Sequence, residues 1–544
     1  MKEIKHADVK YFLDTYYTGN KLSAELKEVF DFYERNSHKN NFFKLFEEYL
    51  EEYNKRLIKD ENMLKDIVVY NYEYVKLYNN ELIVKPGVEC NNKCEFYVNC
   101  INTIDNYYKF LGLDSTIISD CINNKITFFS ELYTMYIKKL NLNIQLNPIL
   151  NMDEEESYIF GRIYTDNDIK ISETNIILEG NLDLNNGNKT QLLNINNMKR
   201  ICFFLGQILT IKGKKEINQF STKYYVSDIH AGLPTFLNEK LDIDFLLKHF
   251  NCKEIEEDNK IEKVYNQNHI LQLYNNDNIH IMICNGYTHI DNEYKDNLDT
   301  FLKIVNEKLP HVVIILGPFL YIRSNETIQK IGDINVIYEY IFNKIIKVAK
   351  KESLEKTHFY IIPSLYDPIN IYPLPQPPFF YEQNDDNTIL KNIHFLSNPS
   401  YIYINEIKIA ITSCDIIYAL TSNLLCRPSE LKLFFLCEQI IKQLSLFPAY
   451  PSEYNIEITK FKNLLFQPNK IPDIFIFPSF TNQKSYVQEV HKKLFICPYS
   501  IDIKKAQPCN FFSNIYILPP TDSQELVKRV VLENIVVSDN KETD

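Results

Sequence analysis

Side chains that could do chemistry are few in the second half of this 544-residue chain, and they do not group into one motif. Among the oxygen and imidazole groups there that could be recruited to hold a hard cation are those of Asp367, Asp415, Asp473, His289 and Asp291. Two such cations held about 3.5–4 Å apart can carry out hydrolysis by generating hydroxide from water. His289 and Asp291 fall in a loop just past a predicted strand, where such a pair is usually a surface feature. We therefore expect none of the five to bind a metal.

Three apolar segments separated by helical ones must position any site in this region. Strands are predicted over residues 279–286, 312–316 and 359–362. The segments between them repeat apolar residues at helical spacing. Strands joined through helices run parallel, and sites in such sheets lie beyond the carboxyl ends of the strands. These ends read Cys284-Asn-Gly286, Gly317-Pro-Phe-Leu320 and Pro363-Ser-Leu-Tyr-Asp367.

The order of these elements resembles that of the metallophosphoesterases, whose strand ends carry D-x-H, G-D-x-x-D, G-N-H-[DE] and G-H-x-H. This chain has Pro318 and Tyr321 in place of the two acids of the second motif. Leu365 and Tyr366 replace the asparagine and histidine of the third motif, and the first and last motifs lack their metal ligands too. The resemblance thus predicts a calcineurin-like phosphoesterase α/β domain over residues 231–544 with no metal site, no catalytic residue, no cofactor and no hydrolytic activity.

The rest of the chain divides into three predicted parts. Residues 1–75 carry an apolar stripe at helical spacing and predict a small helical domain, with docking as an alternative role. The Asn-rich residues 76–120 predict a linker. Residues 121–230 predict a helix, at about 127–140, followed by short β-rich segments separated by Gly or Asn-Gly turns. That spacing is typical of a small antiparallel barrel such as an OB fold.

Charge and composition narrow the function classes. The net charge is −12, with a pI near 5.6, and no stripe of Lys and Arg that would grip DNA phosphates is present. The barrel segment has one basic cluster, Lys212, Lys214 and Lys215, among acidic loops, so we favour a protein-facing barrel over one that binds single strands. The first residues lack a signal sequence, and no apolar run reaches the ~20 residues that span a bilayer.

The 12 cysteines are consequently expected to be reduced, in the cytosol or nucleus. Cys90, Cys94, Cys100 and Cys121 come nearest to a zinc pattern. Their spacing lacks a tight second pair, so scattered thiols are the simpler interpretation.

Several longer sequence segments resemble the B subunits of the replicative DNA polymerases, most closely those of the polymerase alpha branch. They are Leu316-Gly-Pro-Phe-Leu320, Ile362-Pro-Ser-Leu-Tyr-Asp367, Tyr372-Pro-Leu-Pro-Gln-Pro-Pro-Phe379, Ile409-Ala-Ile-Thr-Ser-Cys-Asp415 and, in the barrel, Gly206-Gln-Ile208. The resemblance runs in order from about residue 127 to 518. The proline run 373–378 should form an extended surface segment.

The resemblance implies a non-catalytic, nuclear scaffold subunit of DNA polymerase alpha–primase. Its barrel and inactive phosphoesterase domain would hold the cysteine-rich C-terminal domain of the catalytic subunit and tether it to the primase subunits. The N-terminal domain would recruit other replisome factors, and contact with DNA would be weak or indirect. The alternatives are a divergent metallophosphoesterase, a single-strand-binding module, and the B subunit of a delta- or epsilon-type polymerase.

Overall fold

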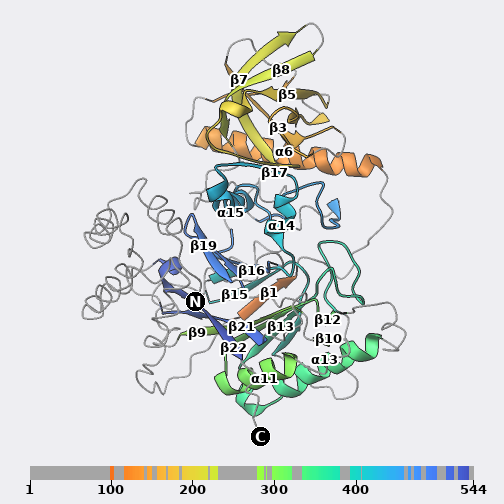
Figure 1. Ribbon diagram of the computed structural model, residues 1–544, viewed down its shortest axis with the longest axis vertical. Helices are drawn as coiled ribbons and strands as arrows, with labels where there is room; N and C mark the ends of the chain where they lie inside the picture. Colours follow the sequence, from red (N-terminus) through yellow and green to blue (C-terminus); the bar gives the residue numbers. More distant parts are fainter. Residues whose placement is uncertain are drawn as a thin grey trace, which may run out of the picture. The chain divides into compact units, whose positions relative to one another are not determined.

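The computed structural model of the chain is shown in Figure 1. With a few positions missing inside these ranges, it describes residues 98–102, 115–139, 144–149, 156–230, 278–290, 297–321, 334–379, 392–479, 485–498, 510–519 and 525–537. All of them belong to one compact unit, Asn71–Asp544. The predicted N-terminal helical domain, residues 1–75, lies outside the described residues.

The barrel domain begins with the long helix α6 (Ser115–Lys139), which is followed by a six-stranded sheet that closes on itself. The strand order is β2-β3-β4-β5-β8-β7, and β3 also pairs with β7. These strands are β2 (Leu146–Asn147), β3 (Ser157–Tyr164), β4 (Ile177–Glu179), β5 (Lys189–Leu193), β7 (Ile208–Asn218) and β8 (Ser221–His230). Their inward side chains, such as Ile159, Leu178 and Tyr224, form a separate apolar core. The predicted barrel is confirmed, and its helix begins about 12 residues earlier than expected.

One predicted barrel segment leaves the barrel. β6 (Ile201–Phe204) does not join the six-stranded sheet but pairs antiparallel with β17 (Leu424–Arg427) of the second domain. Its four residues are all buried, so no alternation marks a solvent face. Such an apolar segment can serve either sheet, and the sequence pattern alone does not separate the two.

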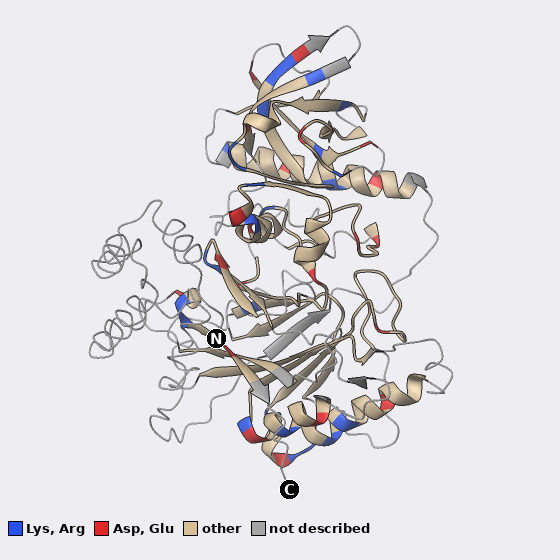
Figure 2. Cartoon of the chain, viewed as in Figure 1, with Lys and Arg blue, Asp and Glu red and all other residues tan. Residues whose placement is uncertain are grey.

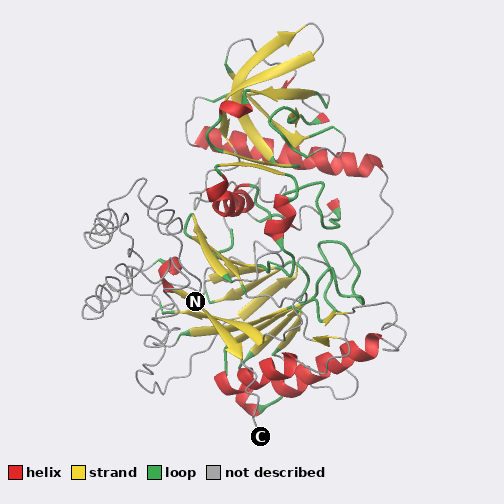
Figure 3. Ribbon diagram, in the orientation of Figure 1, coloured by secondary structure: helices red, strands yellow, loops and turns green. Residues whose placement is uncertain are grey.

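The second domain is built from two six-stranded sheets packed face to face with helices outside (Figure 3). The first sheet has the order β14-β13-β11-β9-β21-β22 and the second β1-β15-β16-β18-β20-β19. The first comprises β9 (Ile279–Asn285), β11 (Val312–Leu316), β13 (His358–Ile362), β14 (Ile393–Phe395), β21 (Asn510–Ile517) and β22 (Val530–Val537). The second comprises β1 (Val98–Asn102), β15 (Ser400–Ile404), β16 (Ile407–Ile411), β18 (Ile474–Ile476), β19 (Tyr486–Val490) and β20 (Lys493–Cys497).

Helices cover the outer face of each sheet. α11 (Asn297–Lys308) and α13 (Ile334–Ala349) share an apolar cluster with the first sheet, and α14 (Ile416–Thr421) and α15 (Lys432–Lys442) share one with the second. A third cluster, which includes Ile314 and Ile409, fills the space between the sheets. Because both faces are covered, β11 is apolar and buried at all five positions.

The predicted parallel order of the first three strands is confirmed. β11 pairs in parallel with β9 and with β13, and their carboxyl ends lie in register at one edge of the sheet. A small parallel pair, β10 (His289–Ile290) with β12 (Leu320–Tyr321), lies just beyond two of these ends.

Two expectations about local segments need correction. The segment predicted as a linker, 76–120, contains β1, which adds a strand to the second sheet, and the first residues of α6. The proline run 373–378 is not a surface segment, because Leu374 and Gln376 are fully buried. Among the helices that the structure describes, none is long and apolar enough to cross a membrane.

Candidate functional site

The carboxyl ends of β9, β11 and β13 meet where a site was expected. In the ladders, Leu316 lies opposite Asn285 on one side and Ile362 on the other. Gly286 donates to the Leu316 carbonyl and Gly317 to the Ile362 carbonyl, which holds the three strand ends together. Any group that follows these positions therefore faces the same small region.

Two of the four predicted degenerate positions, Pro318 and Leu365, bring no side-chain metal ligand into this region. Pro318 is buried, Leu365 is partly buried against the apolar cluster of α14 and α15, and the Tyr366 side chain is 55% exposed. Tyr321 lies in β12, and its side chain is outside the described residues. Proline and leucine side chains have no donor atom that a metal ion could use.

Among the described residues that follow these three strands, Asp367 supplies a carboxylate, and both of its oxygens already accept hydrogen bonds. Oδ1 accepts hydrogen bonds from the Phe319 N–H (2.7 Å) and the Tyr338 hydroxyl (2.6 Å), and Oδ2 accepts one from the Ser364 N–H (2.8 Å). The side chain is 1% exposed, and burial raises its pKa from 3.8 to about 6, against the effect of these hydrogen bonds. Asp367 thus ties the β11 end to the β13 end and to α13.

Gly317 makes room for this carboxylate. A Cβ atom at position 317 would lie 2.3 Å from Asp367 Oδ2 and 2.9 Å from the Ser364 nitrogen. Neither group can move away easily, because both belong to the hydrogen-bonded strand ends. A side chain at 317 is therefore incompatible with this arrangement.

Neutral polar side chains fill the space behind the strand ends, and sequence reasoning missed them. Gln376 donates to the carbonyls of Ser364 and Asn370 (2.9 and 2.6 Å). Asn398 donates to Gln376 Oε1 and Ser413 Oγ, and its oxygen accepts from Thr412 Oγ1 (2.7 Å). Gln376 and Asn398 are both 0% exposed. The proline-rich context of Gln376 suggested a surface segment, and nothing beside Asn398 in the sequence pointed to this role.

The remaining candidate ligands have separate structural roles. Asp415 caps α14 by accepting from the Tyr418 N–H (2.9 Å) and also accepts from Ser479 Oγ (3.1 Å). Asp473 accepts from the Lys408 N–H and pairs with Lys493 (2.7 Å).

His289 belongs to β10, with its side chain outside the described residues, and Asp291 lies outside them entirely. Within the described part of the chain, no three His, Cys, Asp or Glu side chains are grouped so that they could hold a metal ion. The residues present at the strand ends therefore do not fit the two-metal centre of the metallophosphoesterases.

Exposed apolar side chains gather near these strand ends instead. Ile371 is 82% exposed, Tyr372 45% and Tyr418 45%, and with Tyr366 we call them the exposed apolar group. Partial burial, followed by the influence of Cys414 and Tyr418, raises the pKa of Tyr366. Tyr366, Ile371 and Tyr372 follow β13 in one loop, whereas Tyr418 belongs to α14. Large apolar side chains that are exposed together are a feature of protein-binding surfaces.

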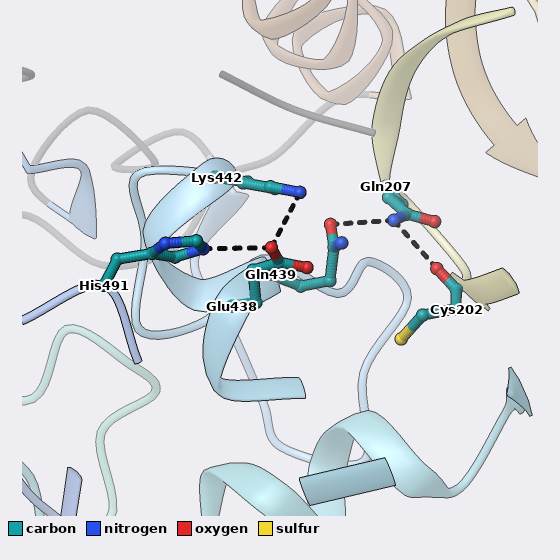
Figure 4. Close-up of polar contacts among 6 residues, drawn as sticks. All are labelled: Cys202, Gln207, Glu438, Gln439, Lys442 and His491. Atoms are coloured by element: carbon teal, nitrogen blue, oxygen red, sulfur yellow. Dashed lines mark hydrogen bonds and ion pairs between the residues drawn. The ribbon is translucent and has the colours of Figure 1, made fainter. Parts of the chain in front are cut away.

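The barrel and the second domain are joined by buried glutamines (Figure 4). Gln207, at the end of the β6 segment, donates to Gln439 Oε1 on α15 (2.9 Å) and to the Cys202 carbonyl (3.0 Å). Gln443, the C-cap residue directly after α15, accepts from the Ile208 N–H (2.9 Å) and donates to the Ile208 carbonyl (2.6 Å). The three glutamine side chains are at most 2% exposed.

Gly206 belongs to the same junction. Its φ is +81°, and a Cβ atom there would lie 2.5 Å from the Tyr450 nitrogen. The segment Gly206-Gln-Ile208 therefore has a structural role, because each of its residues contributes to the contact between the two domains.

Charges of both signs are interspersed along the barrel strands (Figure 2). In the predicted basic cluster, Lys212 pairs with Glu156 at 2.9 Å. On the neighbouring strands, Glu179 pairs with both Arg162 and Lys189. Carboxylates partly neutralise these cations, so the described barrel residues named here do not form an uninterrupted basic track of the kind that binds a nucleic-acid backbone.

Comparison with known proteins matches the two domains separately. The family of DNA polymerase alpha/epsilon B subunits matches residues 281–488, and the OB domain of the DNA polymerase alpha B subunit matches residues 119–231. Similar curated proteins are the DNA polymerase alpha B subunits of Bos taurus (24% identical, over 61% of this chain and 50% of the relative) and Dictyostelium discoideum (30%, over 37% and 31%). The chain spans about half the length, or less, of the curated relatives it matches.

Among solved structures, Vps29 from Entamoeba histolytica is 13% identical, with 48% of this chain and 99% of that chain covered and a TM-score of 0.22. A likeness at that score does not define the fold by itself. The two family models, by contrast, fall on the barrel and on the two-sheet domain and together match more than half of the chain. By this match, the chain belongs to the B-subunit family of DNA polymerases alpha and epsilon.

Proposed function

We propose that this protein is a non-catalytic scaffold subunit of DNA polymerase alpha–primase that acts in the nucleus during initiation of DNA replication. In this proposal the two-sheet domain is a calcineurin-like phosphoesterase domain that has lost its metal site. The main support for this proposal is the hydrogen bonding of Asp367. Both of its oxygens accept hydrogen bonds from backbone and hydroxyl donors of the chain itself, and the nearby positions 318 and 365 are apolar.

The proposed partner of the described domains is the cysteine-rich C-terminal domain of the polymerase alpha catalytic subunit, through which the primase subunits are tethered. The exposed apolar group supports a protein partner, since large side chains, tyrosine above all, are enriched at the energetic centres of interfaces. Residues 1–75 are proposed to recruit other replisome factors. Contact with DNA is proposed to be weak or indirect, in keeping with the paired charges of the barrel.

The test is binding of the full chain to the purified C-terminal domain of the catalytic subunit. The affinities of wild type and of the double variant Ile371→Ser, Tyr372→Ser are measured by isothermal titration calorimetry. We expect tight binding by wild type and a Kd at least roughly tenfold higher for the variant, because hot-spot side chains each contribute about 2 kcal/mol or more.

A matched control comes from α13, where Val336 and Tyr340 are 59% and 53% exposed but lie on the outer helix layer. The variant Val336→Ser, Tyr340→Ser should bind like wild type. Equal loss in both variants would mean that the exposed apolar group is not the contact surface. Binding to a delta- or epsilon-type catalytic subunit in place of polymerase alpha would move the scaffold role to another polymerase.

The enzyme alternative is tested on the same preparation. Turnover of an activated phosphodiester with Mn²⁺ that disappears in Asp367→Ala, while the variant stays folded by circular dichroism, would replace the scaffold proposal with a divergent phosphoesterase. We expect no turnover by either protein.

A further inference from the structure

Two cysteines face each other where the barrel meets the second domain. β6 and β17 form a two-stranded antiparallel sheet in which Cys202 lies directly opposite Cys426. Residues opposed in this way have Cα atoms about 4.5 or about 5.5 Å apart. Disulfide-bonded cysteines have Cα atoms about 4.4–6.8 Å apart, so the backbone is already in the range that a disulfide requires.

The two thiols differ in a way that suits a two-step oxidation. Both side chains contact the same apolar cluster as α15, and the influence of Cys202, followed by that of the nearby Lys432, lowers the pKa of Cys426. The influence of Cys426, followed by burial, raises the pKa of Cys202. Cys426 is half-buried, whereas Cys202 is buried. Oxidation-sensitive cysteines are typically accessible thiolates that lie beside a second, resolving thiol.

We propose that Cys202 and Cys426 are a site of reversible oxidation, at which a low-molecular-weight disulfide such as glutathione disulfide converts the thiol pair into an intramolecular disulfide. The Cys426 thiolate attacks one sulfur of the oxidant, a mixed disulfide forms, and the first low-molecular-weight thiolate leaves. Cys202 then loses its proton, and its sulfur attacks Cys426 Sγ and releases the second thiolate. Two protein thiols are oxidised, and one disulfide is reduced to two thiols.

The consequence of this bond would be a covalent link between the two domains. β17 is also held against the barrel by Arg427, which donates to the carbonyls of Asn196 and Met198 (2.9 and 2.8 Å) and pairs with Glu173. These contacts hold β17 against the barrel at the residue next to Cys426. Oxidation would make separation of the domains impossible without breaking a covalent bond.

The test uses the reduced full chain, incubated with graded ratios of glutathione disulfide to glutathione, then alkylated, digested and mapped by mass spectrometry. We expect a linked Cys202–Cys426 peptide that has lost two hydrogens and disappears on treatment with dithiothreitol. Thermal unfolding should shift to a higher Tm on oxidation and return on reduction, because the disulfide closes a long loop of the unfolded chain.

Variants assign the two steps. Cys202→Ser should stop at a glutathione adduct on Cys426, and Cys426→Ser should leave the buried Cys202 unmodified. Cys121→Ser, at another half-buried cysteine, should form the linked peptide like wild type. Wild-type protein that yields only the glutathione adduct on Cys426, or no oxidation at either position, would overturn the proposal. This mapping does not depend on the proposed function, because it needs no polymerase partner.

Discussion

The buried carboxylate of Asp367 makes a stability prediction that depends on pH. Its pKa is raised from 3.8 to about 6 in the folded chain, mainly by burial. Because the folded-state pKa lies above the unfolded-state value, protonation of Asp367 stabilises the fold below about pH 4. This stabilisation is lost as the pH rises through about 6.

The magnitude follows from the size of the shift. A difference of about 2 units at roughly 1.4 kcal/mol per unit corresponds to about 3 kcal/mol between the protonated and the ionised limits. Asp367→Asn has a similar shape but does not titrate. The free energy of unfolding of wild type minus that of the Asn variant should therefore fall by about 3 kcal/mol between pH 4 and pH 7.5.

Urea unfolding of both proteins is monitored by circular dichroism across this pH range. The effects of all other titrating groups cancel when the unfolding free energy of the variant is subtracted from that of wild type. Tyr338→Phe removes a hydroxyl that donates to Asp367 Oδ1 and holds its pKa down. This second variant should move the titration of Asp367 to higher pH. A wild-type minus Asn difference that is independent of pH, or that grows as the pH rises, would refute the assignment of Asp367 as a buried, structural carboxylate.

Three other perturbations follow from the same geometry. Gly317→Ala should lower the free energy of unfolding by about 1–3 kcal/mol in urea, because the new Cβ would overlap the Asp367 carboxylate. A change below measurement error would contradict the close approach of Asp367 to Gly317. Gln443→Ala should lower the free energy of unfolding by about 2–4 kcal/mol, since it leaves the N–H and the carbonyl of Ile208 unpaired. The variant should also be cleaved at the domain junction in limited proteolysis, and unchanged protease resistance would argue against this contact. Serine substitutions in the exposed apolar group should change the free energy of unfolding by no more than about 0.5 kcal/mol, so a large loss of stability would show that these side chains are packed and not exposed in solution.

Local patterns in the sequence predict the frame of the second domain well. The all-apolar segment 312–316 and the helical repeats beside it are enough to predict parallel strands, and the structure places Asn285, Leu316 and Ile362 in register at one edge. The sequence also predicts that positions 318 and 365 supply no side-chain metal ligand, because proline and leucine have no donor atom in any fold. These features depend only on period and residue type.

Features that depend on distant partners were not predictable. Gln207 and Gln439 are 232 residues apart in the chain, and nothing near either one indicates that they bond. β6 has the composition of a barrel strand, but its partner is β17. Buried Gln376, in a proline-rich segment, likewise bonds with Asn398, which lies 22 residues further along the chain. In each case the deciding interaction is a long-range hydrogen bond, which carries no local periodicity.

The central claim, that this chain is a scaffold of a replicative polymerase, is tested most directly by affinity purification of the native protein from its own cells under mild salt, followed by mass spectrometry. We expect the polymerase alpha catalytic subunit and both primase subunits to be recovered in comparable amounts with this chain. Recovery of the chain without any polymerase subunit would contradict the account.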